Sequence, residues 1–210
     1  MPQSNKRHSR LQSFLDNPAK SMWTLAIPVI AGMGIQTLYT IVDMIFIGKL
    51  GGESIAAVAF NMPIFFFVMG LSFGLGSGVT ASIARFIGAD DKVNADNAAE
   101  HAVAIALIIS AILTIIGLIF GETILMYMGC TPAVLPQAWE YLKVSCYGIT
   151  FGVFSAFFRS ILAGEGDMKL PMIVAALGTV FNIILDPIFI FTLNFGVAGA
   201  AWATTISQII

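Results

Sequence analysis

The sequence predicts an all-α integral membrane protein, and three observations support this fold class. Of the 210 residues, 58% are hydrophobic and only 10% are charged, whereas a soluble domain carries about 25% charged residues. The hydrophobic residues form long continuous runs, and a membrane-spanning helix needs about 20 of them. The runs do not alternate over roughly ten residues, as the strands of a transmembrane barrel would.

The apolar runs predict six transmembrane helices, of which five are complete and the last is truncated. A basic, polar segment, 1–20, precedes them, and the transmembrane lobe is expected to cover 21–210. Within the lobe the predicted spans are about 21–47, 55–83, 98–120, 139–162, 170–193 and 197–210. The last span is still apolar where the sequence stops and is too short to cross a bilayer, so we expect a longer protein.

The connections between the spans are short and polar. GKLGGES at 48–54 and AGEGDMK at 163–169 contain the glycine and acidic residues that favour turns. A further glycine-rich stretch, GLSFGLGSG at 70–78, lies within a span and no strand precedes it, so it predicts close helix packing rather than a phosphate-binding loop. Cys130 and Cys146 have no neighbouring His and no CxxC spacing, and we expect no metal site there.

Lysine and arginine are unevenly distributed over the connections. If the N-terminus is cytoplasmic, eight of the ten basic residues fall on the cytoplasmic side: Lys6, Arg7, Arg10, Lys20, Arg85, Lys92, Arg159 and Lys169. The positive-inside rule therefore predicts a multi-pass protein of the cell (inner or plasma) membrane with its N-terminus in the cytoplasm.

The first and fifth spans repeat one pattern. A shift of 143 positions places Pro28 on Pro171 and Asp43 on Asp186, and both spans then read Pro-x14-Asp-x-Ile-Phe-Ile. Apolar residues can coincide by chance, but a proline and an aspartate at identical spacing favour a structural repeat, which is common in transporters. Because both spans run in the same direction, we expect the two carboxylates at similar depth, toward the outer half of the membrane.

Asp43 and Asp186 are the most costly residues to place in these spans. A charged aspartate at the centre of a membrane helix costs roughly 2.5–3.5 kcal/mol on insertion scales, so packing does not account for two of them. We expect them to face a cavity or each other, where burial favours the neutral form. They predict a proton-binding pair or a Na⁺ site; bonding to a helix backbone broken at Pro187 is the structural alternative.

Polar side chains accompany each aspartate on the same helix face. Asn182 lies four residues before Asp186, while Tyr39 and Gln36 lie four and seven residues before Asp43. These positions predict a proton network or a Na⁺ site formed by Asp43, Asp186 and Asn182. Ordinary interhelical hydrogen bonds are the alternative for Asn182 and Tyr39.

Three apolar positions are candidates for moving or adaptable parts. Pro28 lies inside the first span, where it removes a backbone hydrogen bond and permits either a moving kink or a static bend. Met33 and Met62 could line an adaptable pocket for apolar ligands, although such residues also face lipid or neighbouring helices.

Three stretches are distinctive: IPVIAGMGIQTLYTIVDMIFIGKLGGESIAAVA at 27–59, FRSILAGEGDMKLPM at 158–172 and FNIILDPIFIFTLNFGVAGAAWATT at 181–205. With them the chain resembles, over essentially its whole length, the amino-terminal half of a MATE (multidrug and toxic compound extrusion) transporter. The N-x3-D-P form in the fifth span is most similar to the DinF-like branch. Members have two six-helix lobes, so the resemblance implies one lobe of a twelve-helix fold, with the carboxy-terminal lobe of the same transporter as its partner.

The resemblance also implies roles for individual residues. It places cation coupling at Asp43, Tyr39, Asn182, Asp186 and Thr204. It makes Gln36 a cavity-lining residue and Pro28 the point where the first helix bends. No cofactor is implied beyond the coupling ion, H⁺ or Na⁺.

The implied function is an antiporter that exports organic cations or other amphipathic drugs and toxins, and so confers drug resistance. Its partners would be these small substrates and membrane lipid, without nucleic acid. A lipid-linked precursor flippase of the same superfamily is the alternative, and it would need basic cavity residues, for which only Arg159 is a candidate. An enzyme is not expected, because neither Asp43 nor Asp186 belongs to a Gly-x-Gly-Asp motif of the kind that intramembrane aspartyl proteases carry.

Overall fold

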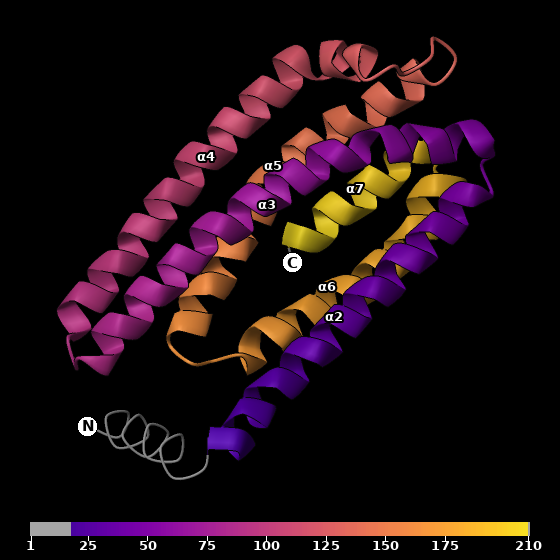
Figure 1. The fold of residues 1–210 in the computed structure, drawn as a ribbon. Coiled ribbons are helices and arrows are strands. Elements are labelled where there is room, and N and C mark those ends of the chain that lie inside the picture. The colour runs from indigo at the N-terminus through magenta and orange to yellow at the C-terminus, as the bar shows by residue number, and fades with distance from the viewer. Residues whose placement is uncertain (1–17, 210) are drawn as a thin grey trace.

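The computed structural model describes residues 18–209 as an all-helical bundle (Figure 1), and within α2 the side chains of Pro28, Gln36 and Tyr39 lie outside the described set. The elements are α2 (Pro18–Gly48), α3 (Gly52–Gly88), α4 (Lys92–Tyr127), α5 (Leu135–Gly164), α6 (Lys169–Pro187), the π-helix η1 (Ile188–Thr192) and α7 (Gly196–Ile209). In this described part, five segments are long and apolar enough to cross a membrane: 30–48, α3, α4, α5, and α6 with η1. The predicted all-α membrane fold is confirmed.

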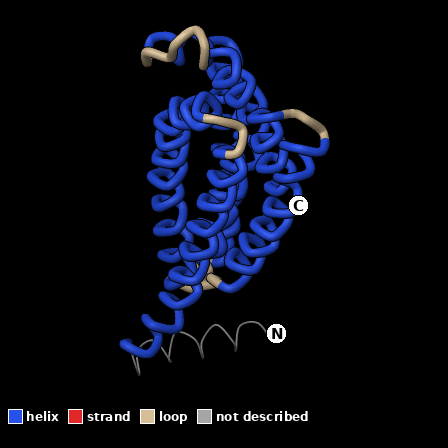
Figure 2. Tube along the Cα trace, turned by 90° about the vertical axis from the view of Figure 1, so that its right-hand side faces the viewer, coloured by secondary structure: helices blue, strands red, loops and turns tan. Residues whose placement is uncertain are grey.

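Successive helices alternate in direction because short turns join them (Figure 2). α2, α4 and α6 run one way, and α3, α5 and α7 run back. We call the end of the lobe where α2 meets α3, and where η1 meets α7, the Gly51 end. Gly51 has a φ of 116°, which L-residues with a side chain rarely adopt, so the predicted glycine turn forms at this point.

The helices continue beyond several predicted span ends. A count of apolar residues stops where the hydrocarbon would stop, but a helix can continue into water. α4 begins at Lys92 rather than near position 98 because Asp91 caps it, accepting the Asn94 N–H at 3.1 Å and the Asn94 amide at 2.6 Å. These hydrogen bonds from Asn94 hold the pKa of the Asp91 carboxyl below its usual value.

The helices form two groups (Figure 1). α3, α4 and α5 pack around a buried core that includes Ala106, Leu142 and Phe157, while α2 and α6 lie side by side as a parallel pair. α7 lies between the groups and contacts α5, α6 and η1. At the Gly51 end a second buried cluster, which includes Ile47 and Ile190, joins the two groups.

The predicted span 170–193 is not a uniform α-helix. Pro187 has no N–H to continue the helical ladder, and the next residues form η1, in which the Leu193 N–H donates to the Ile188 carbonyl at 2.9 Å. α7 packs closely on this segment, since a Cβ on Gly199 would lie 2.6 Å from the Phe189 carbonyl oxygen. Asp186 is therefore held immediately before a change in helix type.

Candidate functional site

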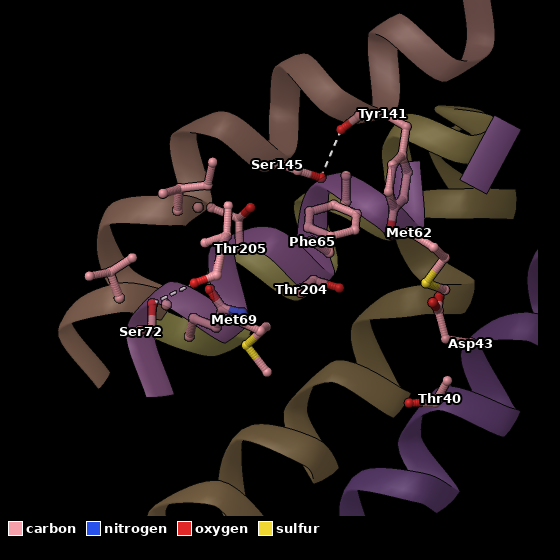
Figure 3. A pocket seen from close by; sticks show the side chains of 17 residues that line it. Thr40, Asp43, Met62, Phe65, Met69, Ser72, Tyr141, Ser145, Thr204 and Thr205 are labelled. Atoms are coloured by element: carbon pink, nitrogen blue, oxygen red, sulfur yellow. Dashed lines mark hydrogen bonds between the residues drawn. The ribbon is translucent and has the colours of Figure 1, made fainter. Parts of the chain in front are cut away.

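A cavity of about 240 Å³ lies between the two groups of helices (Figure 3). Its wall combines one carboxylate, several hydroxyls and a set of apolar side chains. From α2 and α7 it is lined by Thr40, Asp43, Ala201, Thr204, Thr205 and Gln208. From α3 and α5 it is lined by Met62, Phe65, Val68, Met69, Ser72, Tyr141, Ser145, Gly148, Ile149, Gly152 and Val153.

Asp43 brings its carboxyl group into this cavity from the last two turns of α2. The side chain is only 8% exposed, and Oδ1 has no hydrogen-bond partner among the described residues. Figure 3 shows it beside Met62, at the end of the cavity nearest Tyr141. Leaving a buried carboxylate oxygen unpaired is costly, so Oδ1 offers a position where a proton or a cation would be stabilised.

Asp186 lies behind the cavity wall rather than in it. It is fully buried in α6, it does not line the cavity, and its Oδ1 also has no hydrogen-bond partner in the described part of the chain. The Asp43 carboxyl group is near enough to interact electrostatically with that of Asp186. Two like charges at short range in a medium of low dielectric repel strongly, so the pair favours uptake of a positive charge.

Asn182 connects Asp186 to the cavity wall. With its nitrogen directed toward Asp186, the amide donates to Oδ2 at 3.0 Å and its oxygen accepts the backbone N–H of Thr204 at 3.1 Å. The reversed amide leaves only a 3.3 Å hydrogen bond from its nitrogen to Thr204 Oγ1 and directs its oxygen toward acceptors alone. Because an amide oxygen accepts and does not donate, the first orientation satisfies both groups.

Thr204 therefore belongs to both parts of the site. Its backbone contacts the buried Asn182 and Asp186 pair, and its side chain lines the cavity that Asp43 faces. The side chains of this site are those of Asp43, Asp186, Asn182 and Thr204, and they offer only oxygen and amide groups. No cluster of three or more His, Cys, Asp or Glu occurs among the described residues. Carboxylate, amide and hydroxyl oxygens suit a proton or a hard cation such as Na⁺ rather than a transition metal.

The remaining site predictions have different outcomes. Met62 lines the cavity, whereas Met33 does not and is 67% exposed on α2. Tyr39, Gln36 and Pro28 belong to α2 by backbone, but their side chains lie outside the described residues, so their roles stay predictions.

The sequence reading did not single out several polar lining residues. Tyr141 packs edge-on against Phe65, with ring centroids 5.9 Å apart, and closes the cavity beside Asp43. Gln208 lies one turn of α7 after both Thr204 and Thr205, at i+4 and i+3, and this spacing was a signal available in the sequence. The sequence alone does not show that this face meets α5, because the contact forms only when the helices pack.

Buried carboxylates next to a cavity between membrane helices are typical of helical membrane transporters. Comparison with known protein families agrees with this class and narrows it to one family. The chain matches the MatE family over residues 28–188. The protein belongs to the MatE family of transporters, which is not a family of enzymes.

Several curated proteins are similar to this chain over most of its length. The multidrug export protein MepA of Staphylococcus saprophyticus is 33% identical over 198 residues, which are 91% of this chain and 43% of the relative. A protein described as an FAD transporter, from Shewanella oneidensis, is 29% identical over 184 residues, which are 85% of this chain and 41% of the relative. The chain therefore spans about two fifths of the length of these relatives.

Solved structures of the same kind match the fold. A crystal structure described as MATE in the straight conformation is 42% identical, with a TM-score of 0.87, over 92% of this chain and 43% of that one. A MOP superfamily transporter from Pyrococcus furiosus is 43% identical, with a TM-score of 0.85, over 88% of this chain and 41% of that one. The fold of the lobe is thus that of one part of a larger MATE chain.

Proposed function

We propose that the complete protein is an antiporter that exports organic cations or other amphipathic drugs and toxins in exchange for H⁺ or Na⁺. The observation that carries this proposal is the buried Oδ1 of Asp43, which has no hydrogen-bond partner among the described residues and faces a cavity with a largely apolar wall. An apolar wall with one negative group is the chemistry that an amphipathic cation needs. Family membership and the relatives named as multidrug export proteins support the same conclusion.

Competition for one negative charge would explain the exchange. An organic cation in the cavity is attracted by the carboxylate of Asp43, which is close enough to Asp186 for the two carboxyl groups to interact electrostatically. A proton or Na⁺ bound to this pair neutralises the charge and weakens the hold on the organic cation. The proposed coupling cluster therefore comprises Asp43, Asp186, Asn182 and Thr204, with Tyr39 as a further member.

The arrangement of α2 supports a moving part. α2 packs mainly on α6 and makes few contacts with α3 and α7, so a bend at Pro28 could change the width of the cavity without disrupting the core of α3, α4 and α5. In this proposal the charge state of Asp43 selects between two shapes of α2.

The setting of the lobe is part of the proposal. The distribution of Lys and Arg supports a cell-membrane protein with a cytoplasmic N-terminus, and the N-x3-D-P sequence at 182–187 supports the DinF-like branch. A carboxy-terminal lobe would complete the substrate pathway, since the relatives are more than twice as long as the matched segment. Exposed isoleucines along α4, such as Ile108 and Ile119, suit contact with lipid.

A gradient experiment tests the coupling. The protein, expressed from its complete reading frame, would be assayed for efflux of a fluorescent lipophilic cation while a pH gradient or a Na⁺ gradient is imposed separately. We expect efflux to follow one of the two gradients, and Asp43→Asn or Asp186→Asn to reduce it to the level of cells without the protein. Each replacement keeps the size of the side chain and removes the charge on which the exchange depends.

Asp96→Asn is the matched control, since Asp96 is exposed near the start of α4 and away from the cavity. It should leave efflux unchanged. Normal gradient-driven efflux in both Asp43→Asn and Asp186→Asn would overturn the coupling proposal. The flippase alternative is less well supported, because the cavity is lined by no lysine or arginine of the described part, Arg159 included.

A further inference from the structure

The cavity has two chemically different ends (Figure 3). Asp43 and Tyr141 lie at one end, and Ser72 and Thr205 lie at the other. On α5 the lining extends from Tyr141 to Val153, a step of twelve residues that covers about 18 Å at the rise of an α-helix. A ligand whose charge is held at Asp43 can therefore extend along the cavity to the second end.

Among the described lining residues, those at the second end are polar and none is charged. The Ser72 hydroxyl donates to the Val68 carbonyl at 2.8 Å, which leaves its oxygen able to accept a hydrogen bond. The Gln208 amide forms no hydrogen bond with any residue whose side chain or backbone the structure describes, so toward these residues two N–H groups and one carbonyl oxygen remain available. Together these side chains can bind a neutral group that both donates and accepts hydrogen bonds.

Two glycines of α5 let the polar side chains of α7 approach. A Cβ on Gly148 would lie 2.6 Å from Thr205 Oγ1, and a Cβ on Gly152 would lie 3.2 Å from Gln208 Oε1. A methyl group at position 152 would be tight against Gln208 Oε1, so the amide would have to shift by a few tenths of an ångström. The absence of a side chain at position 152 leaves room for the amide at this end of the cavity.

The wall between the two ends is apolar and adaptable. Met62, Phe65 and Met69 of α3 form one side of it, and Ile149 of α5 contributes to the other. Methionine side chains are flexible and fit ligands of varied shape. This wall can therefore bind the body of a ligand without selecting its outline, which leaves the two polar ends to determine preference.

We propose that Ser72 and Gln208 form a neutral hydrogen-bonding subsite that selects elongated cations bearing an uncharged polar group at the end opposite their charge. The proposal deepens the proposed function and rests on it only in taking this cavity as the substrate site. Gly152 is a positioning residue for the subsite, because it acts through Gln208.

Binding of two matched probes tests this subsite. The probes are octyltrimethylammonium and the same cation with a carboxamide at the end of its chain, titrated calorimetrically into the purified protein expressed from its complete reading frame. The intact protein should bind the carboxamide probe more tightly. Gln208→Leu and Ser72→Ala should each reduce that preference by roughly two- to tenfold, the value of one hydrogen bond.

Three further variants serve as controls. Ser77→Ala removes a hydroxyl that bonds to the preceding turn of α3, at Gly74, but does not line the cavity, so the preference should be unchanged. Asp43→Asn should weaken both probes by the same factor, because both carry the same charge. Gly152→Ala should lower the preference for the carboxamide probe, because the added methyl group crowds Gln208 Oε1.

Equal binding of the two probes to the intact protein would overturn the subsite. So would an unchanged preference in both Ser72→Ala and Gln208→Leu, and Ser72→Ala alone decides the matter if Gln208→Leu does not fold. These outcomes are separate from the transport proposal, since the ratio of affinities is measured at equilibrium without any gradient. A protein that prefers the carboxamide probe but shows no gradient-driven efflux would keep the subsite and lose the antiporter.

Discussion

Asn182 is an amide at a position where a carboxylate or a hydroxyl would not serve. It donates to Asp186 Oδ2 and at the same time accepts the backbone N–H of Thr204, and only a side chain with both functions satisfies the two neighbours. This contact links the fully buried Asp186 carboxyl group to the cavity, because the backbone of Thr204 contacts Asn182 while its side chain lines the cavity. A substitution at Thr204 should therefore alter the coupling of ion binding to efflux while Asp43 and Asp186 themselves stay unchanged.

We predict that Thr204→Val lowers the apparent affinity of the protein for its coupling ion. The replacement keeps the shape and removes the hydroxyl, so the ion concentration for half-maximal efflux should rise roughly two- to tenfold, while Thr204→Ser should restore the native value. Efflux measured over a range of pH or Na⁺ checks this. Thr179→Val is the control, because the Thr179 hydroxyl bonds within α6 to Ala175 at 2.9 Å. Equal effects at both positions would indicate general damage to the fold.

At the scale of elements, the contact between α7 and η1 fixes the position of Asp186. α7 approaches the backbone of η1 through Gly199, where a Cβ would meet the Phe189 carbonyl. A backbone segment cannot move aside as the end of a flexible side chain can. The two elements are therefore held together by shape, at the point where Pro187 ends the regular α-helix.

We predict that Gly199→Ala destabilises the lobe by about 1–3 kcal/mol, the usual cost of overpacking. Gly74→Ala should be neutral or slightly stabilising, because nothing lies within 4 Å of a Cβ there and alanine favours helix over glycine. Thermal unfolding of the two variants in detergent checks the difference. Equal melting temperatures would show that η1 can shift to accept the methyl group.

The parallel pair of α2 and α6 accounts for the repeated sequence pattern. Both helices run toward the Gly51 end and lie side by side, and each carries its aspartate near that end. The shared Pro-x14-Asp spacing therefore brings two acids to neighbouring positions. The π-helical turn after Pro187 has no counterpart in α2, which remains α-helical to Gly48.

At the scale of the whole molecule, the cavity exists because two groups of helices meet mainly at one end. The buried cluster around Ile47 and Ile190 joins them at the Gly51 end, and the cavity lies between them. The side of the membrane that this end faces defines the topology of the lobe. The distribution of basic residues predicts that the Gly51 end faces outward.

Cysteine labelling checks this orientation. In a protein with Cys130 and Cys146 replaced by alanine, Lys49→Cys should react with a membrane-impermeant maleimide added to intact cells. Lys92→Cys, at the start of α4 and at the opposite end of the lobe, should react only after the cells are opened. Both positions are exposed, so a difference in reactivity reports their side of the membrane, and the reverse pattern would invert the proposed topology.

The sequence by itself determined the class of the protein and its two central residues. Hydrophobic composition requires a bilayer, and a carboxylate in an apolar run is costly wherever it lies, so Asp43 and Asp186 could be selected without a structure. The positions of turns followed from glycine, as at Gly51. These properties are local along the chain, and local properties can be read from it.

Only the tertiary structure decided which side chains share a site. It brought Asn182 against Thr204 across two helices, placed Asp186 behind the cavity wall, and set Ser72 and Gln208 at the end opposite Asp43. In a soluble helix the apolar face identifies the inner side, but a membrane helix is apolar on every face. Which faces meet depends instead on close contacts of small residues such as Gly148 and Gly199, and these are defined only when the helices pack.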